Sequence, residues 1–358
     1  MKPSVSIIIP VFNAEATLGE TLQSVALEVS ADRTILWSII AIDDGSTDSS
    51  AEILFSWTSK LPLKILNSNH SGGPAIPRNL GIAESNSDYV FFLDSDDVLL
   101  PGGLTATVHF AVENNSDVVL PRLKSLDGRG VPRGMFGENL AEVKLTDSRI
   151  YWALNPMKLI RRSILTDDSI RFDTSLRRDE DQPFSFKVYL AASKISILSN
   201  PPVVGVRYSP EGTNLTMRAY KPEDCFEFLN SMVAIMDSGV PDPGERNFLM
   251  IRHWEIEIAR ELFWQRLALL PESDWIRTID WLLNFSKSHL VPDMLPRTSI
   301  RWRGIVGLIG SSKTDYLVKL LKARRDVLQD KSPVKKYLGI INSNWIRLKS
   351  TLRLPVAF

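Results

Sequence analysis

The sequence predicts an α/β fold with a doubly wound, mixed but mostly parallel sheet, followed by helices. Short apolar runs alternate with amphipathic runs as far as about residue 120, an order typical of βαβ units in a parallel sheet. From about residue 222, apolar residues recur at helical spacing. We therefore expect a sheet domain of residues 1–221, a helical linker or acceptor-side domain of residues 222–298, and a basic C-terminal helical segment of residues 299–358.

Each predicted strand of the first domain comes from a short apolar run, and each helix from apolar residues spaced three or four apart. Pro10 and Asn13 close the first run, Asp43 and Asp44 follow the second, and Pro77 suits the first turn of a helix. The predicted strands are residues 5–13, 35–42, 63–66, 89–93 and 117–120, and the predicted helices are residues 15–29, 47–59 and two that begin near Pro77 and Pro101.

Beyond residue 120 the pattern is less regular. Residues 121–150 are rich in glycine and predict either an acceptor-side loop or a plain surface excursion. The acids of residues 179–181 precede a predicted helix at residues 184–192, where they would also favour the positive end of the helix dipole. The later predicted helices are residues 223–237, 245–269, 272–288, and 312–329 and beyond, the last after a basic segment.

The composition is that of an ordinary soluble globular protein, with 44% hydrophobic and 23% charged residues. The 358 residues suggest two or three domains. The single cysteine, Cys225, excludes an internal disulfide and a cysteine-based zinc site, and the four scattered histidines argue against a histidine metal cluster. No signal-peptide pattern and no apolar run near the roughly 18 residues of a membrane span occur. We expect a cytoplasmic protein.

The net charge of zero hides an asymmetry. Residues 301–358 carry 13 Lys and Arg against 3 Asp and Glu, a net charge of +10, so residues 1–300 carry −10. Such a basic tail suggests an anionic partner or packing between subunits. A solvated basic helical tail is an equally good interpretation.

The most informative stretch is the apolar run of residues 89–93, which leads directly into Asp94, Ser95, Asp96 and Asp97. Such a run predicts a strand buried on both faces, and open parallel sheets bind ligands beyond the carboxyl ends of their strands. Because residues i and i+2 of an extended segment point the same way, we expect Asp94 and Asp96 to face one site and Asp97 to face away. Two carboxylates suit Mg²⁺ or Mn²⁺ bound to substrate phosphates, whereas an acidic loop or helix N-cap is the alternative.

Polar residues also follow two other predicted strands, and all of them would meet at one edge of the sheet. These residues are Asn13 after the first strand, Asp43 and Asp44 after the second, and Asp94 and Asp96 after the fourth. This edge is where a nucleotide would lie. No Gly-x-Gly-x-x-Gly follows the first strand, which argues against a dinucleotide fold. Residues 310–314 lack the first glycine of a P-loop and lie in a helical tail.

The motifs, in this order, resemble those of the inverting glycosyltransferases of family 2, which have a nucleotide-binding GT-A fold. The matching segments are residues 6–13, 43–46, 77–79, 94–97 and 180–182. The resemblance covers residues 4–215. Within the family, the chain is similar to the N-acetylglucosaminyltransferases that act on poly(ribitol phosphate) of wall teichoic acid. This second likeness rests on residues 73–79, 113–117, 151–154 and 180–182, and on Trp281, Asn284, Phe285, Ser286 and Lys287.

The resemblance implies an enzyme that moves a sugar, with GlcNAc expected, from a UDP-sugar to a hydroxyl of a cell-surface polymer such as poly(ribitol phosphate). It implies a donor site made of Pro10, Phe12, Asn13, Asp43, Asp44, Arg78, Asp94 and Ser95. Asp94 and Asp96 would hold the diphosphate through Mn²⁺ or Mg²⁺. Asp181, with Glu180 as the alternative, would accept the proton of the attacking hydroxyl. A single displacement would convert an α-linked donor into a β-linked product.

An anionic polymer requires cations away from the donor site, and we expect Trp152, His253 and Arg260 on the acceptor side. His253 and Arg260 are seven residues apart in a predicted helix, so they would share a face and could bind phosphates. Ordinary solvated charge is the alternative, because three glutamates lie at residues 255–261.

Other functions remain open at this stage. A nucleotidyltransferase would also use metal ions at a sheet edge, but no basic N-terminal loop for a triphosphate is visible. A glycosyltransferase of capsular or exopolysaccharide synthesis and a non-catalytic carbohydrate-binding scaffold are further alternatives. For residues 301–358 we expect assembly into a homo-oligomer, a trimer by the resemblance, with contact to the inner face of the cell membrane as the second choice. A nucleic-acid partner is not expected.

Overall fold

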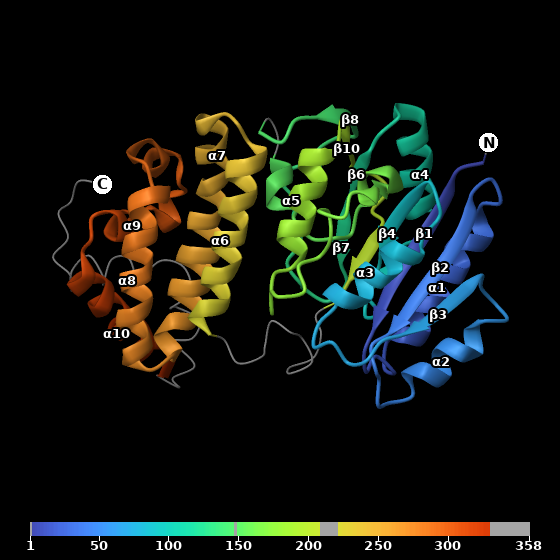
Figure 1. The fold of residues 1–358 in the computed structure, drawn as a ribbon, viewed down its shortest axis with the longest axis horizontal. Coiled ribbons are helices and arrows are strands. Elements are labelled where there is room, and N and C mark those ends of the chain that lie inside the picture. Colours follow the sequence, from blue (N-terminus) through green and yellow to red (C-terminus); the bar gives the residue numbers. More distant parts are fainter. Residues whose placement is uncertain (1, 147–148, 208–220, 330–358) are drawn as a thin grey trace. The chain divides into compact units, whose positions relative to one another are not determined.

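The computed structural model describes residues 2–146, 149–207 and 221–329 (Figure 1). It consists of two compact units, each described here by itself. The first contains residues 1–219 and 230–239, and the second contains residues 220–229 and 240–358. Helix α6 (Pro222–Gly239) contributes residues to both.

The first unit is built on an eight-stranded sheet with the strand order β3-β2-β1-β4-β9-β6-β10-β8. Its strands are β1 (Ser4–Val11), β2 (Leu36–Asp43), β3 (Leu63–Asn67), β4 (Tyr89–Phe92), β6 (Val118–Pro121), β8 (Leu140–Val143), β9 (Leu159–Arg161) and β10 (Ile195–Leu198). Strands β3, β2, β1 and β4 run parallel, as do β6 and β10. Strand β9 is antiparallel to both β4 and β6, and β8 is antiparallel to β10. The sheet is therefore mixed, as predicted.

A smaller sheet and a set of helices complete this unit (Figure 1). The smaller sheet has the order β5-β11-β7, with strands β5 (Val98–Leu99), β11 (Val204–Val206) and β7 (Leu123–Ser125). The helices are α1 (Leu18–Ala31), α2 (Ser50–Trp57), α3 (Ala75–Glu84), α4 (Gly103–Asn114) and α5 (Asp181–Ala191), with short 3₁₀ turns at η1 (Arg149–Trp152) and η2 (Arg162–Thr166). Helix α3 packs on β1 and β2, and α4 on β6, β9 and β10.

The core of the first unit lies around β1 and β4. All residues of β4 and all but the first of β1 are buried, which explains why both strands are continuous apolar runs. Helix α3 approaches β1 so closely that a Cβ on Gly81 would lie 2.4 Å from Cγ2 of Ile8. Only glycine fits there, and this close approach brings Arg78 of the same helix to the sheet.

The strands that run from β1 to β4 confirm the predicted order, and two regions differ from the prediction. Residues 121–150 contain β7 and β8, and β9 follows them. These strands have only three or four residues, too few for a periodic signal. Helix α5 begins at Asp181 rather than at residue 184, so the acidic cluster forms the helix start.

The second unit is helical in its described part. Its elements are α7 (Pro243–His253), the π-helical segment η4 (Trp254–Arg266), η5 (Leu267–Leu269), α8 (Glu272–His289), η6 (Pro292–Arg297), α9 (Ile300–Gly310) and α10 (Thr314–Gln329). Helix α9 lies within the predicted basic C-terminal helical segment, before the individual helix predicted from residue 312. It packs on α8 and η4, and α10 packs on η5. Val306 and Leu321 are fully buried, so both helices belong to the core of this unit.

In the part of the chain that the structure describes, no helix is long and apolar enough to cross a membrane. Residues 330–358, which form half of the basic segment for which we expect a homo-oligomer, lie outside the described residues.

Candidate active site

The loops that follow β1, β2 and β4 meet at one edge of the sheet. Parallel pairing places Val11, the last residue of β1, beside Asp43, the last residue of β2, whereas β4 ends earlier, at Phe92 opposite Ile8. The carboxyl ends of all three parallel strands nevertheless point to the same edge of the sheet. Asn13 accepts a hydrogen bond of 2.8 Å from the backbone N–H of Thr47, just beyond β2. The predicted meeting of these loops is therefore present.

Asp43 and Asp44 are both buried and hold the loops at this edge together. Asp43 accepts the backbone N–H of Ser46 at 3.0 Å. Asp44 accepts the hydroxyl and the backbone N–H of Ser71 at 2.8 and 3.0 Å, and also the hydroxyl of Ser68. Both carboxylates are thus tied to the turns that frame the edge.

An aromatic pair, which the sequence reasoning missed in part, lies beside Asp44. The rings of Phe12 and His70 stack with centroids 4.2 Å apart and an interplanar angle of 18°. His70 Nδ1 lies 3.7 Å from Asp44 Oδ2. Gly45 has a φ of +75°, and a Cβ there would lie 3.1 Å from the backbone nitrogen of His70. His70 follows β3 at the same edge, so the rule that selected Asp94 after β4 would also have selected it.

The acidic turn follows β4 directly, and it brings three carboxylates together rather than two. Ligand oxygens of Asp94, Asp96 and Asp97 all lie within 4.8 Å of one another. The expectation that Asp97 faces away is therefore wrong. Strand β4 ends at Phe92, and a turn closed by a 3.1 Å hydrogen bond from Asp97 N–H to the Asp94 carbonyl replaces the extended geometry.

Two threonines at the start of α1 hold this turn in place. The hydroxyls of Thr17 and Thr21 donate to the carbonyl of Ser95 at 2.9 Å, and Thr21 also donates to the carbonyl of Asp97 at 2.8 Å. Asp97 itself is fully buried, where its Oδ1 accepts the backbone N–H of Arg207 at 2.9 Å. Burial, together with the charges of Asp94 and Asp96, raises the pKa of Asp97 to about 8.

Arg78 connects the acidic turn to the start of α5. This buried guanidinium donates from Nη2 to Asp94 Oδ1 at 2.8 Å and from Nη1 to Glu180 Oε1 at 2.9 Å. Burial acts to lower the pKa of Arg78, but the charges of Asp94 and Glu180 outweigh it and hold the pKa above its ordinary value. Arg78 also lies over the ring of Phe172, 5.2 Å from its centroid.

The two candidate bases lie side by side at the first turn of α5. Glu180 lies just before the helix and accepts a hydrogen bond from Arg78. Asp181 is the first residue of the helix and is partly exposed. Burial, with the charges of Glu180 and Asp179, raises the pKa of Asp181 to about 8, against the opposing charges of Arg78 and Lys158. A base with a pKa near the working pH is suited to proton transfer.

Pro10 and Ser95, two further residues of the predicted donor site, contribute backbone positions to this edge. Pro10 is buried within β1. Ser95 lies in the acidic turn, where its carbonyl is bonded to α1. On the acceptor side, Trp152 ends the 3₁₀ turn η1 and is half-buried.

His253 and Arg260 do not share a face as predicted. His253 is fully buried, and its Nδ1 lies 3.0 Å from Oε2 of Glu257, which also accepts from Arg252 at 3.0 Å. Arg260 has a side chain 42% exposed and pairs with Glu261 at 2.9 Å. The reason is that η4 is π-helical and has more residues per turn than the roughly 3.6 of an α-helix. Seven residues therefore do not complete two turns.

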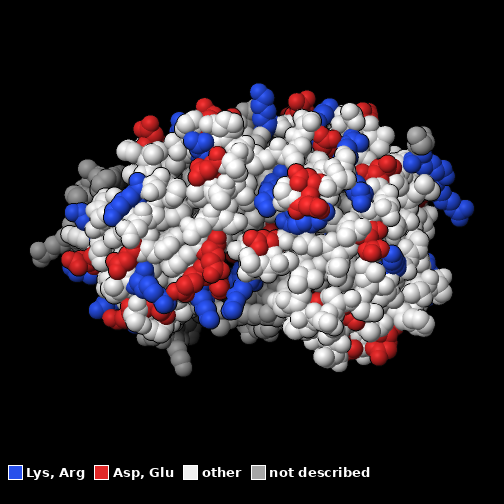
Figure 2. All heavy atoms as spheres, viewed as in Figure 1, with Lys and Arg blue, Asp and Glu red and all other residues white. Residues whose placement is uncertain are grey.

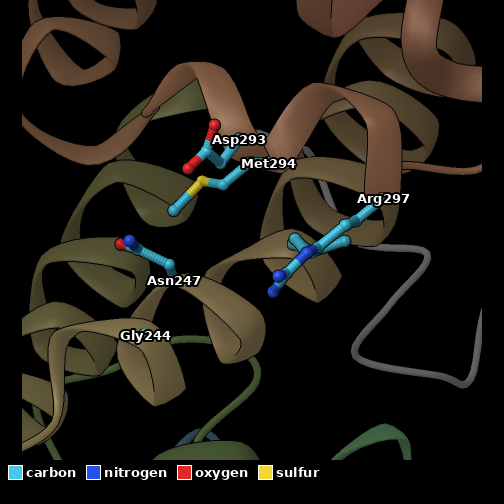
Figure 3. A pocket seen from close by; sticks show the side chains of 6 residues that line it. Gly244, Asn247, Asp293, Met294 and Arg297 are labelled. Carbon is cyan, nitrogen blue, oxygen red and sulfur yellow. The ribbon is translucent and has the colours of Figure 1, made fainter.

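A shallow pocket in the second unit is lined by Gly244, Asn247, Ile251, Asp293, Met294 and Arg297 (Figure 3). None of the predicted site residues lines it, and a basic and an acidic side chain both border it. Over the face seen in Figure 2, acidic and basic side chains are interspersed, so that face does not present a field of one sign. The candidate site therefore rests on the contacts at the sheet edge.

Comparisons with known proteins agree with this geometry. The family model described as Glycosyl transferase family 2 matches residues 6–171. The chain is 32% identical over 279 residues to the poly(ribitol-phosphate) beta-N-acetylglucosaminyltransferase TarS of Staphylococcus aureus, over 76% of this chain and 48% of the relative. It is 30% identical over 308 residues to the poly(ribitol-phosphate) beta-glucosyltransferase of Bacillus spizizenii, over 83% of this chain and 47% of the relative.

A solved structure is also similar. The crystal structure of S. aureus TarS 1-349 in complex with UDP-GlcNAc matches with a TM-score of 0.76 and 28% identity, and covers 92% of this chain and 93% of that one. The mixed sheet and the helices around it are thus an α/β architecture of the GT-A type. The chain belongs to glycosyl transferase family 2. It spans about half the length of the two curated relatives.

Proposed function

We propose that this chain transfers a sugar from a UDP-sugar to a hydroxyl of a poly(ribitol phosphate)-type polymer, with inversion at the anomeric carbon. The observation that carries the proposal is the Arg78 bridge, which brings the acidic turn and the start of α5 into one site. In this proposal the acidic turn would hold the diphosphate through a divalent cation, and a carboxylate at the start of α5 would accept the proton of the hydroxyl. The names of both curated relatives describe this class of transfer.

The donor side would use the aromatic pair and the acidic turn. The uracil would stack on the outer face of the stacked ring pair of Phe12 and His70, which lies beside Asp44. Arg78 would lie close to the diphosphate, where its buried positive charge opposes the developing negative charge of the leaving UDP. GlcNAc is the sugar we propose, since the similar solved structure contains UDP-GlcNAc, and glucose is the alternative that the second relative's name suggests.

The acidic turn fits a divalent cation. Three carboxylate oxygens within 4.8 Å are hard ligands of the kind that Mg²⁺ and Mn²⁺ prefer. Among the described contacts, Arg78 engages Oδ1 of Asp94 and leaves Oδ2 for such an ion. We propose that Asp94 and Asp96 hold Mn²⁺ or Mg²⁺, which when bound would neutralise charge on the leaving diphosphate.

The acceptor side would use Asp181 as the base. Its carboxylate would accept the proton of the acceptor hydroxyl while that oxygen attacks the anomeric carbon from the face opposite UDP. Glu180 is the less suitable base, because Arg78 already occupies it. Trp152 and Arg260 remain proposals for the acceptor side. His253 would bind a phosphate only if its contact with Glu257 opened, since it is fully buried.

Assembly and location also remain proposals. We propose a homo-oligomer, a trimer, with contact to the inner face of the membrane as the alternative, in a cytoplasmic enzyme. Because α9 and α10 belong to the core of the second unit, a chain shortened at residue 298 would lose buried residues. The full chain is therefore better compared with a chain that ends at residue 329. Light scattering of these two chains, together with sedimentation on anionic vesicles, would distinguish a homo-oligomer from contact with a membrane.

The function is tested by release of UDP. Purified protein with Mn²⁺ would be offered UDP-GlcNAc, UDP-glucose and other UDP-sugars, with and without a ribitol phosphate oligomer. We expect acceptor-dependent UDP release and a β-linked product, which NMR of the anomeric proton would identify. UDP release that requires a different acceptor class would replace the proposed polymer. Binding of glycans without any UDP release would favour the scaffold interpretation.

A further inference from the structure

Lys158 is a fully buried lysine close to the candidate base. It immediately precedes β9 and is 1% exposed. Its ammonium donates to the hydroxyl of Ser185 at 3.1 Å and to the carbonyl of Asn155, and lies 5.1 Å from the centroid of the Tyr189 ring. All three partners are neutral, although a buried ammonium is costly unless an opposite charge acts on it.

The contact with Ser185 defines where this ammonium lies. Ser185 is four residues after Asp181 in α5, so both side chains lie on the same face of the helix. Lys158 therefore lies against the helix face that carries the candidate base. Lys158 also lines a small hollow, and the other residues that line it are all uncharged: Leu120, Pro121, Leu123, Pro132, Phe136, Ala153, Asn155 and Met157.

The charges around Asp181 are unevenly committed. Asp179 and Glu180 repel its carboxylate, whereas Arg78 and Lys158 attract it. Arg78 is shared between Asp94 and Glu180, to both of which it donates. For Lys158, by contrast, burial lowers the pKa, and Asp181 is the carboxylate whose charge opposes that change. Of these two cations, therefore, Arg78 is shared with two other carboxylates, whereas Lys158 acts on Asp181.

We propose that Lys158 is a positioning residue for Asp181, whose buried ammonium supplies the positive charge that a carboxylate base needs at the start of α5. This inference rests on the proposed function, since it requires Asp181 to act as the base. It assigns no contact with either substrate to Lys158. A purely structural lysine would instead serve only to fill the space between Asn155, Ser185 and Tyr189.

The test uses Lys158→Met in the full chain, with UDP release measured across pH. A nearby charge shifts a pKa by roughly 1 unit or more. The acid limb of kcat/KM should therefore move upward by about one pH unit, with kcat/KM at pH 7 about tenfold lower. Binding of UDP should be unchanged. Lys187→Met is the matched control, because Lys187 lies in α5 with Asp181, is half-buried and donates to the Ser169 carbonyl at 3.0 Å. The acid limb of kcat/KM should not move in this variant.

Two further variants decide between a charge and a packing role. Lys158→Arg should restore the acid limb if charge matters, and Lys158→Gln, which remains polar, should not. If Lys158→Met fails to fold by circular dichroism, this Arg and Gln pair provides the same comparison. An acid limb that is identical in the wild type, the Gln variant and the Met variant would overturn the proposal, whatever the loss of stability.

The Asp181→Asn background separates this inference from the function on which it rests. Adding Lys158→Met to Asp181→Asn should not lower kcat further if Lys158 acts through Asp181. Equal losses in the presence and absence of Asp181 would overturn the positioning role. Full activity of Asp181→Asn alone would instead show that the base was misassigned, and with it the proposal for Lys158, while UDP-sugar transfer itself would stand.

Discussion

Arg78 and Glu180 are joined by a hydrogen bond of 2.9 Å between Nη1 and Oε1, although 102 residues separate them in the chain. The other terminal nitrogen of Arg78 reaches Asp94 at 2.8 Å. One side chain of α3 thus connects the turn after β4 with the start of α5. The proposed donor and base ends of the site depend on this link, and it is the first target for mutation.

Replacement of Arg78 by Met should lower stability and abolish transfer. It would leave Glu180 buried without its cation and remove the only described hydrogen bond of the Asp94 carboxylate. Breaking a buried pair by removing one partner costs about 3 kcal/mol or more, to be measured by urea unfolding. Arg277→Met is the control, since its side chain is 58% exposed and pairs with Glu223 and Asp274. We expect at most about 1 kcal/mol there. Equal effects in both variants would contradict a structural role for the bridge.

Loss of the acidic turn should abolish transfer through loss of the divalent cation. Asp96→Ala should be inactive and Asp94→Ala severely impaired, because the carboxylates that fit a cation lie together in this turn. A chelator should silence the wild type, and added Mn²⁺ or Mg²⁺ should restore it. Titration of Mn²⁺ followed by calorimetry gives a second readout, with weaker binding expected in both variants. Full activity in the presence of chelator would rule out the metal assignment.

Asp181→Asn should lower turnover by about 10² or more, the usual share of general base catalysis, with little change in UDP binding. The amide keeps the shape of the side chain and removes its capacity to accept a proton. Glu180→Gln is the comparison, and it should act mainly on stability, because Glu180 is engaged by Arg78. A larger loss of turnover in Glu180→Gln than in Asp181→Asn would reverse the assignment of the base.

The stability of the metal-free protein should respond to pH through Asp181. Its pKa is raised from 3.8 to about 8 on folding, so the folded chain holds more protons than the unfolded chain between these values. The free energy of unfolding therefore falls as pH rises through this window. Asp181→Asn removes this contribution. The free energy of unfolding of the variant, relative to that of the wild type, should therefore increase as pH rises from about 4 to about 8. Thermal unfolding in chelator at both ends of the window measures the gap, and a constant gap would contradict the raised pKa.

Removal of the aromatic surface should weaken donor binding. Base stacking on an aromatic side chain contributes about 1–3 kcal/mol, so Phe12→Ala should raise the Kd for UDP by roughly 5- to 150-fold. His70→Ala should have a smaller effect, because its side chain is 48% exposed. Phe55→Ala, which removes a ring 75% exposed on α2, is the control and should not change the Kd. Unchanged UDP binding in Phe12→Ala would mean that the base lies elsewhere.

Much of the candidate site at the sheet edge could be predicted from local sequence. The apolar runs of β1, β2 and β4 are continuous because the parallel half of the sheet is buried, and polar residues follow each of them. That pattern is sufficient to bring Asn13, Asp43 and Asp94 to one edge, because the carboxyl ends of parallel strands point to the same edge of a sheet. The helical second half was also predictable, since its apolar residues recur at helical spacing.

Only the tertiary structure decided which charges meet and which are hidden. Sequence spacing treats the acids after β4 as extended, whereas the turn that α1 holds brings Asp97 to the other two. Likewise, η4 separates His253 from Arg260, and buried Lys158 contacts Ser185 of α5, the helix that Asp181 begins. Short strands such as β9 have too few residues for a periodic signal, and side-chain pairs such as Arg78 with Glu180 join segments far apart in the chain. Local periodicity reports which face of an element is apolar, but the partner that covers that face is set by how the whole chain packs.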